Sequence, residues 1–85
     1  MKTIEVPTEL APIIEGVIRH YKYAMDKHPT FPNDLIKQAA VVAEEAGELL
    51  REANNDNIGL SRHECYQTAA VSFRMLVYLE TTLNS

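Results

Sequence analysis

The C-terminal segment, from about Arg62 to Leu83, is apolar on almost every side of the helix that its spacing predicts. After Glu64, its only charged residues are Arg74 and Glu80. A helix without a polar face is usually buried on several sides. Three helices of ~20 residues, each ~30 Å long, cannot surround it within one chain. We therefore expect a homo-oligomer in which helices of a neighbouring copy complete a four-helix bundle.

The length of the chain leads to the same expectation. Its 85 residues allow one domain, spanning residues 1–85. A chain of this size buries only roughly 60–65% of the surface that its unfolded form exposes. Cys65 is the only cysteine, so no internal disulfide reinforces the core. We expect a core that is marginal within one subunit.

Two absences indicate the compartment. No apolar run approaches the ~20 residues that a membrane-spanning helix needs. The N-terminus carries no basic and apolar leader of the secretory type. With a single cysteine, the sequence predicts a cytoplasmic, reducing location and no contact with membranes.

Helical spacing predicts an all-α chain, and its first helix covers roughly residues 8–27. Thr8 is the expected N-cap, and Pro12 falls in the first turn, where a missing N–H costs little. Residues 28–32 contain two prolines and cannot continue a helix. The first helix therefore ends before a short loop.

Two further helices follow. The second is expected from about residue 34 to 54, with Asn33 as its N-cap. The third is expected from about residue 62 to 83, because Ser61 and Glu64 have the spacing of a capping box. These are the three main helices of the predicted fold.

The net charge of −4 is unevenly distributed. Residues 1–39 contain five acidic and five basic residues, so the whole acidic excess lies in residues 40–85. This half lacks the basic patch that direct binding to nucleic acid requires. A negative cluster can still meet phosphates when a divalent cation lies between them.

Carboxylates gather on one side of the second helix. On a helical wheel, Lys37, Glu44, Glu45, Glu48 and Glu52 share one sector of ~100°. Like charges three or four residues apart each destabilise a helix by a few tenths of a kcal/mol. A Mg²⁺ ion, which prefers carboxylate oxygens, would offset that repulsion.

Glu64 opens the third helix one loop later. If the second and third helices are antiparallel, Glu64 approaches Glu48. Gly47 lies inside the acidic run, where glycine costs about 1 kcal/mol against alanine and suits the close approach of a backbone or ligand. The alternative interpretation is an ordinary solvated acidic face, with Glu64 acting only as a capping residue.

The two acidic segments resemble a known family. Glu45-Ala46-Gly47-Glu48, a spacer, and Glu64-Cys65-Tyr66-Gln67 resemble the ExxE and ExxD halves of the MazG-type, all-α nucleoside triphosphate pyrophosphohydrolases. Residues 31–34, 44–48 and 64–76 resemble a short phage- and integron-type subgroup, and the likeness covers roughly residues 27–80. The departure is Gln67, which stands where the family has an aspartate. A glutamine carbonyl can bind Mg²⁺ but brings no charge, so we expect weaker metal binding, substitution by another acid such as Asp34, or reduced activity.

The resemblance implies a fold, a reaction and a cofactor. The implied fold is an all-α bundle assembled as a homodimer or a dimer of dimers. The implied reaction hydrolyses a nucleoside triphosphate, with Mg²⁺, between the α and β phosphates and releases a monophosphate and pyrophosphate. The usual role is house-cleaning of non-standard nucleotides.

Site roles follow from the resemblance and from the residues themselves. The resemblance implies metal binding by Glu45, Glu48, Glu64 and Gln67, and catalytic roles for Glu44, Glu45 and Glu48. Lys37, on the same stripe, is a candidate contact for a phosphate. Arg74, nearly three turns after Glu64, is a more distant one. Phe31 is a candidate for stacking on a base, as are Tyr21 and Tyr23.

Two other functions remain open at this stage. The first is a non-catalytic helical dimerisation or regulatory module that retains the scaffold, which the Gln67 departure and the short chain favour. The second is a purely structural bundle with a solvated acidic face. Neither the preferred nucleotide nor the choice between dimer and tetramer follows from the sequence.

Overall fold

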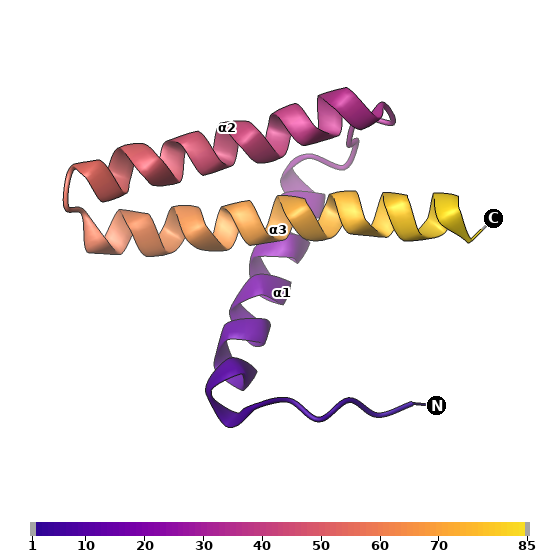
Figure 1. Ribbon diagram of the computed structural model, residues 1–85, viewed down its shortest axis with the longest axis horizontal. Helices are drawn as coiled ribbons and strands as arrows, with labels where there is room; N and C mark the ends of the chain where they lie inside the picture. The colour runs from indigo at the N-terminus through magenta and orange to yellow at the C-terminus, as the bar shows by residue number, and fades with distance from the viewer. Residues whose placement is uncertain (1, 85) are drawn as a thin grey trace.

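The computed structural model describes residues 2–84 and is helical, with no strand among them. A short 3₁₀ turn, η1 (Thr8–Leu10), precedes α1 (Ala11–Lys27), and α2 (Leu35–Asn54) and α3 (Ile58–Leu83) follow (Figure 1). The all-α prediction is confirmed. Within residues 2–84, no helix combines the length and apolar character needed to cross a membrane.

α2 and α3 form an antiparallel hairpin, and α1 crosses α3 steeply (Figure 1). The turn of the hairpin occupies residues 55–57, and Asp56 takes a left-handed backbone conformation with φ of 55°. α1 packs against α3 and does not contact α2. The antiparallel arrangement of the second and third helices, on which the expected approach of Glu64 to Glu48 depended, is therefore present.

The N-cap of α2 lies one residue later than predicted, and α2 begins at Leu35. Asp34, not Asn33, is the N-cap, and its carboxylate accepts a hydrogen bond from the Lys37 backbone N–H at 3.1 Å. The Asn33 carbonyl instead accepts a hydrogen bond from the Tyr78 hydroxyl on α3 at 3.2 Å. A contact far away in sequence thus places Asn33 in the loop.

α3 begins one turn earlier than predicted, at Ile58. Asn57 is the N-cap, and its side-chain oxygen accepts a hydrogen bond from the Leu60 N–H at 3.0 Å. Ser61 and Glu64 therefore lie inside the helix, and the predicted capping box is wrong. The Glu64 carboxylate is not occupied in capping, which leaves it available to face α2.

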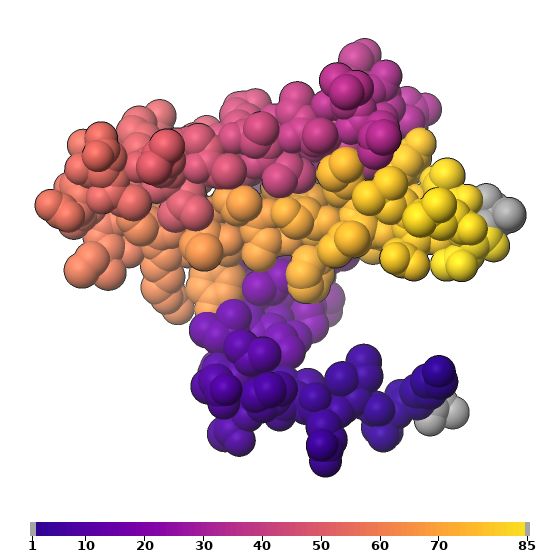
Figure 2. Space-filling view, in the orientation of Figure 1, coloured from indigo at the N-terminus to yellow at the C-terminus, as the bar shows by residue number. Residues whose placement is uncertain are grey.

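The start of the first helix also differs from the prediction. Thr8 begins the 3₁₀ turn, Pro7 precedes it, and no side chain caps this end. Pro12 lies in the first turn of α1, as predicted. Residues 2–7 are exposed and stand away from the body of the molecule (Figure 2).

The crossing of α1 and α3 depends on a glycine. A Cβ added to Gly16 would lie 2.6 Å from Cε1 of Tyr66. The Tyr66 ring in turn stacks on His20, with ring centroids 4.9 Å apart and planes 8° apart. A larger residue at position 16 would therefore force the Tyr66 ring to move away from its stack on His20.

The apolar core of one chain is small. Val17, Ala70 and Val71 are its buried apolar residues, whereas Leu76 and Val77 on α3 are 49% and 54% exposed. The accessible surface is 6728 Å². A compact folded chain of this mass exposes only about 5,100 Å². A single subunit thus leaves much of the apolar surface of α3 uncovered.

Candidate functional site

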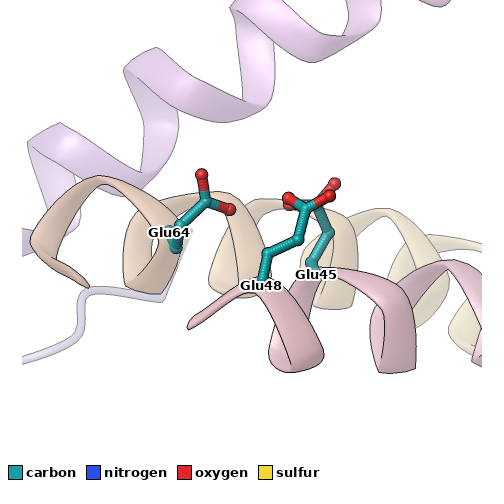
Figure 3. A group of neighbouring side chains, drawn as sticks. All are labelled: Glu45, Glu48 and Glu64. Carbon is teal, nitrogen blue, oxygen red and sulfur yellow. The ribbon is translucent and has the colours of Figure 1, made fainter. Parts of the chain in front are cut away.

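Three carboxylates from two helices converge beside the α2–α3 hairpin. Glu45 and Glu48 come from α2 and Glu64 from the second turn of α3. One oxygen of each lies within 4.8 Å of the others, and Figure 3 shows all three on one side of the helix pair. The antiparallel turn brings them together, because it places the beginning of α3 against the later part of α2. These three residues are called the carboxylate cluster below.

Burial and repulsion raise the pKa of Glu45 above its ordinary value. Loss of solvent around the half-buried side chain is the largest cause, followed by the negative charges of Glu48, Glu64 and Glu44. Each of these effects disfavours the ionised form. A cation held by the cluster would act in the opposite direction.

The pKa of Glu64 is raised as well. Burial is the largest cause, and the close approach and negative charge of the Glu48 carboxylate add to it. His63 and Arg51 oppose the shift. The Oε2 atom of Glu64 is shielded from solvent and has no hydrogen-bond partner within residues 2–84. A shielded carboxylate oxygen without a donor is costly, so this oxygen is suited to a cation.

A cavity of about 620 Å³ adjoins the carboxylate cluster. α1, α2, α3 and the loop between α1 and α2 all contribute to its wall. Its acidic end is lined by Glu44 and Glu45, and Phe31 and Arg74 also line it. Gln67 lines it too, one helical turn after Glu64. The volume falls in the range of about 300–1,000 Å³ that small-molecule sites usually have.

Six of the sequence candidates line this cavity: Tyr23, Phe31, Glu44, Glu45, Gln67 and Arg74. Glu48 and Glu64 lie beside it in the carboxylate cluster, and Tyr21 and Lys37 are not part of its wall. The position of Lys37 differs most from the prediction. This lysine is exposed near the start of α2 and lines a separate cavity with residues 30–33 of the loop. It precedes Glu44 by seven residues, which is ~10 Å along the helix axis. A helical wheel shows only the angular positions of residues, so it does not show that Lys37 and Glu44 are far apart along the helix axis.

Lys27 is a cavity residue that sequence reasoning missed. It lies in the last turn of α1 and lines the cavity together with Tyr23. Its Nζ atom is 5.8 Å from the centroid of the Tyr23 ring. Lys27 follows Tyr23 by four residues, so the sequence could have predicted that the two side chains are neighbours on one helix. Only the crossing of α1 and α3 places both of them in the cavity that Glu44 and Glu45 line.

Gly47 has no close neighbour in the chain. A Cβ added there would meet no atom within 4 Å among residues 2–84. The expectation that a backbone approaches the acidic run at this glycine is therefore not met within one subunit.

Comparison with known protein families, with curated proteins and with solved structures gives no match to this chain. The likeness of its two acidic segments to the MazG-type family therefore stays a prediction. The structure brings Glu45, Glu48 and Glu64 of these segments within 4.8 Å of one another, beside a cavity that Glu45 and Gln67 line.

Proposed function

We propose that the chain is a Mg²⁺-dependent nucleoside triphosphate pyrophosphohydrolase. It cleaves the bond between the α and β phosphates and releases a nucleoside monophosphate and pyrophosphate, in a house-cleaning role. The observation that carries this proposal is the convergence of Glu45, Glu48 and Glu64 within 4.8 Å of one another, from two helices. The resemblance of the two acidic segments to the MazG-type pattern supports it.

The donor set suits Mg²⁺. Carboxylate oxygens are the hard ligands that this cation prefers, and it usually keeps several waters and shares substrate phosphates. Three carboxylates on one side of a helix pair leave the other coordination positions to water and phosphate. The shielded Oε2 atom of Glu64, without a donor in the described part of the chain, is a natural ligand.

The chain's own side chains supply the remaining chemistry. When bound, Mg²⁺ polarises phosphoryl oxygens and lowers the pKa of a bound water. Glu44 is exposed at the acidic end of the cavity, next to Glu45, where a carboxylate can accept a proton from an attacking water. Lys27, which lines the same cavity from α1, offers a flexible ammonium group to a phosphate.

Gln67 adjusts this site rather than abolishing it. The residue follows Glu64 by one turn and lines the cavity together with Glu45, and its amide oxygen is the proposed further ligand of the cation. It contributes no negative charge. We expect weaker binding of Mg²⁺ than a site with a fourth carboxylate would have.

The proposed enzyme is a homo-oligomer in which a second copy covers α3. The 6728 Å² surface of one chain exceeds the value for a compact monomer by about 1,600 Å² per chain. Covering that excess in a dimer removes about 3,200 Å², within the range of obligate homodimers. The exposed apolar residues Phe73, Leu76 and Val77 on α3 are the expected contacts.

A non-catalytic dimerisation or regulatory module is the alternative. The neutral Gln67 and the large apolar surface favour this alternative. A module that only binds a partner needs an apolar surface and does not need a full set of charged metal ligands. This alternative predicts that nucleotides are bound weakly or not at all and are never cleaved. The enzyme proposal predicts pyrophosphate release.

The deciding experiment measures pyrophosphate release with Mg²⁺ over a panel of standard and damaged nucleoside triphosphates. Wild type should release pyrophosphate from at least one of them, and Glu48→Gln should not. Glu52→Gln is the matched control, because Glu52 lies one turn further along α2 and outside the carboxylate cluster. If wild type and Glu48→Gln are equally inactive on every nucleotide, the enzyme proposal is wrong.

A further inference from the structure

The loop between α1 and α2 is held in place by three side-chain donors. They come from α2 and α3, and each donates to a backbone carbonyl of the loop. The pairs are Arg74 Nη2 to His28 at 2.8 Å, Gln38 Nε2 to Pro32 at 2.6 Å and Tyr78 Oη to Asn33 at 3.2 Å. A loop anchored near both ends presents its intervening residues in a defined orientation.

Phe31 is the side chain that this loop presents. It is half-buried and lines the large cavity as well as two smaller neighbouring ones. Its ring lies over the Arg74 guanidinium, with Cζ 4.5 Å from the ring centroid. The Phe31 ring therefore packs against the Arg74 guanidinium, while its backbone belongs to the anchored loop.

Arg74 itself is 7% exposed. No carboxylate within residues 2–84 forms an ion pair with it. Its charge is compensated by the His28 carbonyl and the face of the Phe31 ring. Because these contacts engage the guanidinium with the loop, Arg74 is suited to positioning Phe31.

The position of this pair along α3 indicates which part of a ligand it meets. Arg74 follows Glu64 by ten residues, which is ~15 Å along the helix axis. Gln67 and Val71 lie between them on the same cavity wall. A ligand with phosphates at the carboxylate cluster would extend its other end toward Phe31.

We propose that the loop end of this cavity binds the base of the nucleotide, with Phe31 as the stacking surface and Arg74 as a positioning residue. This inference rests on the proposed function, since it takes the phosphates to lie at the carboxylate cluster. It changes the role of Arg74 from a contact for phosphate to a support for the aromatic ring.

The test compares two probes by calorimetry in the presence of Mg²⁺. One is a panel of non-hydrolysable α,β-methylene nucleoside triphosphates with different bases, and the other is inorganic tripolyphosphate, which has no base. Stacking on an aromatic side chain contributes a factor of about ten in affinity. Wild type should bind at least one nucleotide analogue about tenfold more tightly than tripolyphosphate. Phe31→Ala and Phe31→Leu should lose most of this preference and retain the affinity for tripolyphosphate.

Two further variants sharpen the test. Ile36→Ala is the control, because Ile36 is an exposed apolar residue in the first turn of α2 that lines none of the cavities beside the loop. It should keep the wild-type preference. Arg74→Gln should weaken binding of the analogue in the wild-type chain and add little in Phe31→Ala, because a positioning residue acts through the ring. Arg74→Lys, which keeps the charge without the planar group, should rescue only part of the affinity.

Three results would overturn the inference. In the first, wild type binds the nucleotide analogues and tripolyphosphate with equal affinity. In the second, both Phe31 variants keep the wild-type preference for the nucleotide analogue. In the third, Arg74→Gln weakens the binding of both probes equally, which would make Arg74 a phosphate ligand. Failure of the proposed reaction is recognised separately. In that case wild type prefers the base-containing analogue but releases no pyrophosphate from any nucleotide.

Discussion

Replacing Glu48 by glutamine should have opposite effects on stability with and without Mg²⁺. The Glu48 carboxylate has an oxygen within 4.8 Å of both Glu45 and Glu64. Two unit charges at that separation repel by about 0.9 kcal/mol in bulk water, and roughly half of this remains at physiological salt. Glu48→Gln removes two of the three repulsions in the cluster. We expect the free energy of unfolding of the metal-free chain to rise by about 1 kcal/mol.

Mg²⁺ reverses the order of the two proteins. A ligand present at one hundred times its dissociation constant stabilises the folded state by about 2.7 kcal/mol. For a domain of this size, each kcal/mol raises Tm by about 4–8 °C. Wild type should therefore gain more than about 10 °C from saturating Mg²⁺. Glu48→Gln, which lacks one of the three ligands, should gain little.

The assay is thermal unfolding followed by circular dichroism, in EDTA and in MgCl₂, with ionic strength matched by NaCl. The protein concentration is kept constant, because the Tm of an oligomer depends on it. Glu52→Gln should respond to Mg²⁺ as wild type does. The reasoning is refuted if wild type has the same Tm in MgCl₂ and in matched NaCl, or if Glu48→Gln gains as much as wild type.

Three further predictions concern pH, helix packing and assembly. The metal-free chain should lose stability relative to Glu48→Gln as the pH rises from 4.5 through the raised pKa values of Glu45 and Glu64 in the folded state. In this pH range the folded state binds more protons than the unfolded state does, so a rise in pH favours unfolding. Urea unfolding at a series of pH values measures this, and a gain in stability with pH would contradict it. Alanine stabilises a helix relative to glycine by about 1 kcal/mol, so Gly47→Ala should stabilise the chain by that amount. Gly16→Ala should instead destabilise it by about 1 kcal/mol, because overpacking against Tyr66 costs about 1–3 kcal/mol. Equal effects of the two substitutions in urea unfolding would show that the close approach at the α1–α3 crossing is absent. Sedimentation equilibrium at micromolar concentration should give wild type a multiple of 9.6 kDa and Leu76→Glu a lower mass, and a monomeric wild type would contradict the proposed assembly.

Helix ends show where local signals were insufficient. Asn33 and Asp34 are both good N-caps, and Ser61 with Glu64 has capping-box spacing, so the sequence offers competing starts for α2 and α3. The structure selects Asp34 and Asn57. Contacts with the rest of the molecule decide between such starts, as the hydrogen bond from Tyr78 to the Asn33 carbonyl illustrates.

The candidate site was predictable where it depends on one helix or one turn. The pair Glu45 and Glu48 follows from helical spacing, and the approach of Glu64 follows from a short turn between antiparallel helices. Lys37 shows the limit of that reasoning, because it shares their sector of the helical wheel yet lines a separate cavity. Angular position on a helix says nothing about separation along its axis.

Three helices, the two acidic segments and the apolar character of the third helix follow from the sequence, because they depend on spacing and turn residues over a few neighbouring positions. The crossing of α1 and α3, the cavity beside the acidic residues and the burial of Arg74 against Phe31 depend on the packing of the helices. The bond from Arg74 to the His28 carbonyl joins residues 46 positions apart. No local pattern encodes such a pairing, because it forms only when the packing of three helices brings loop and helix together.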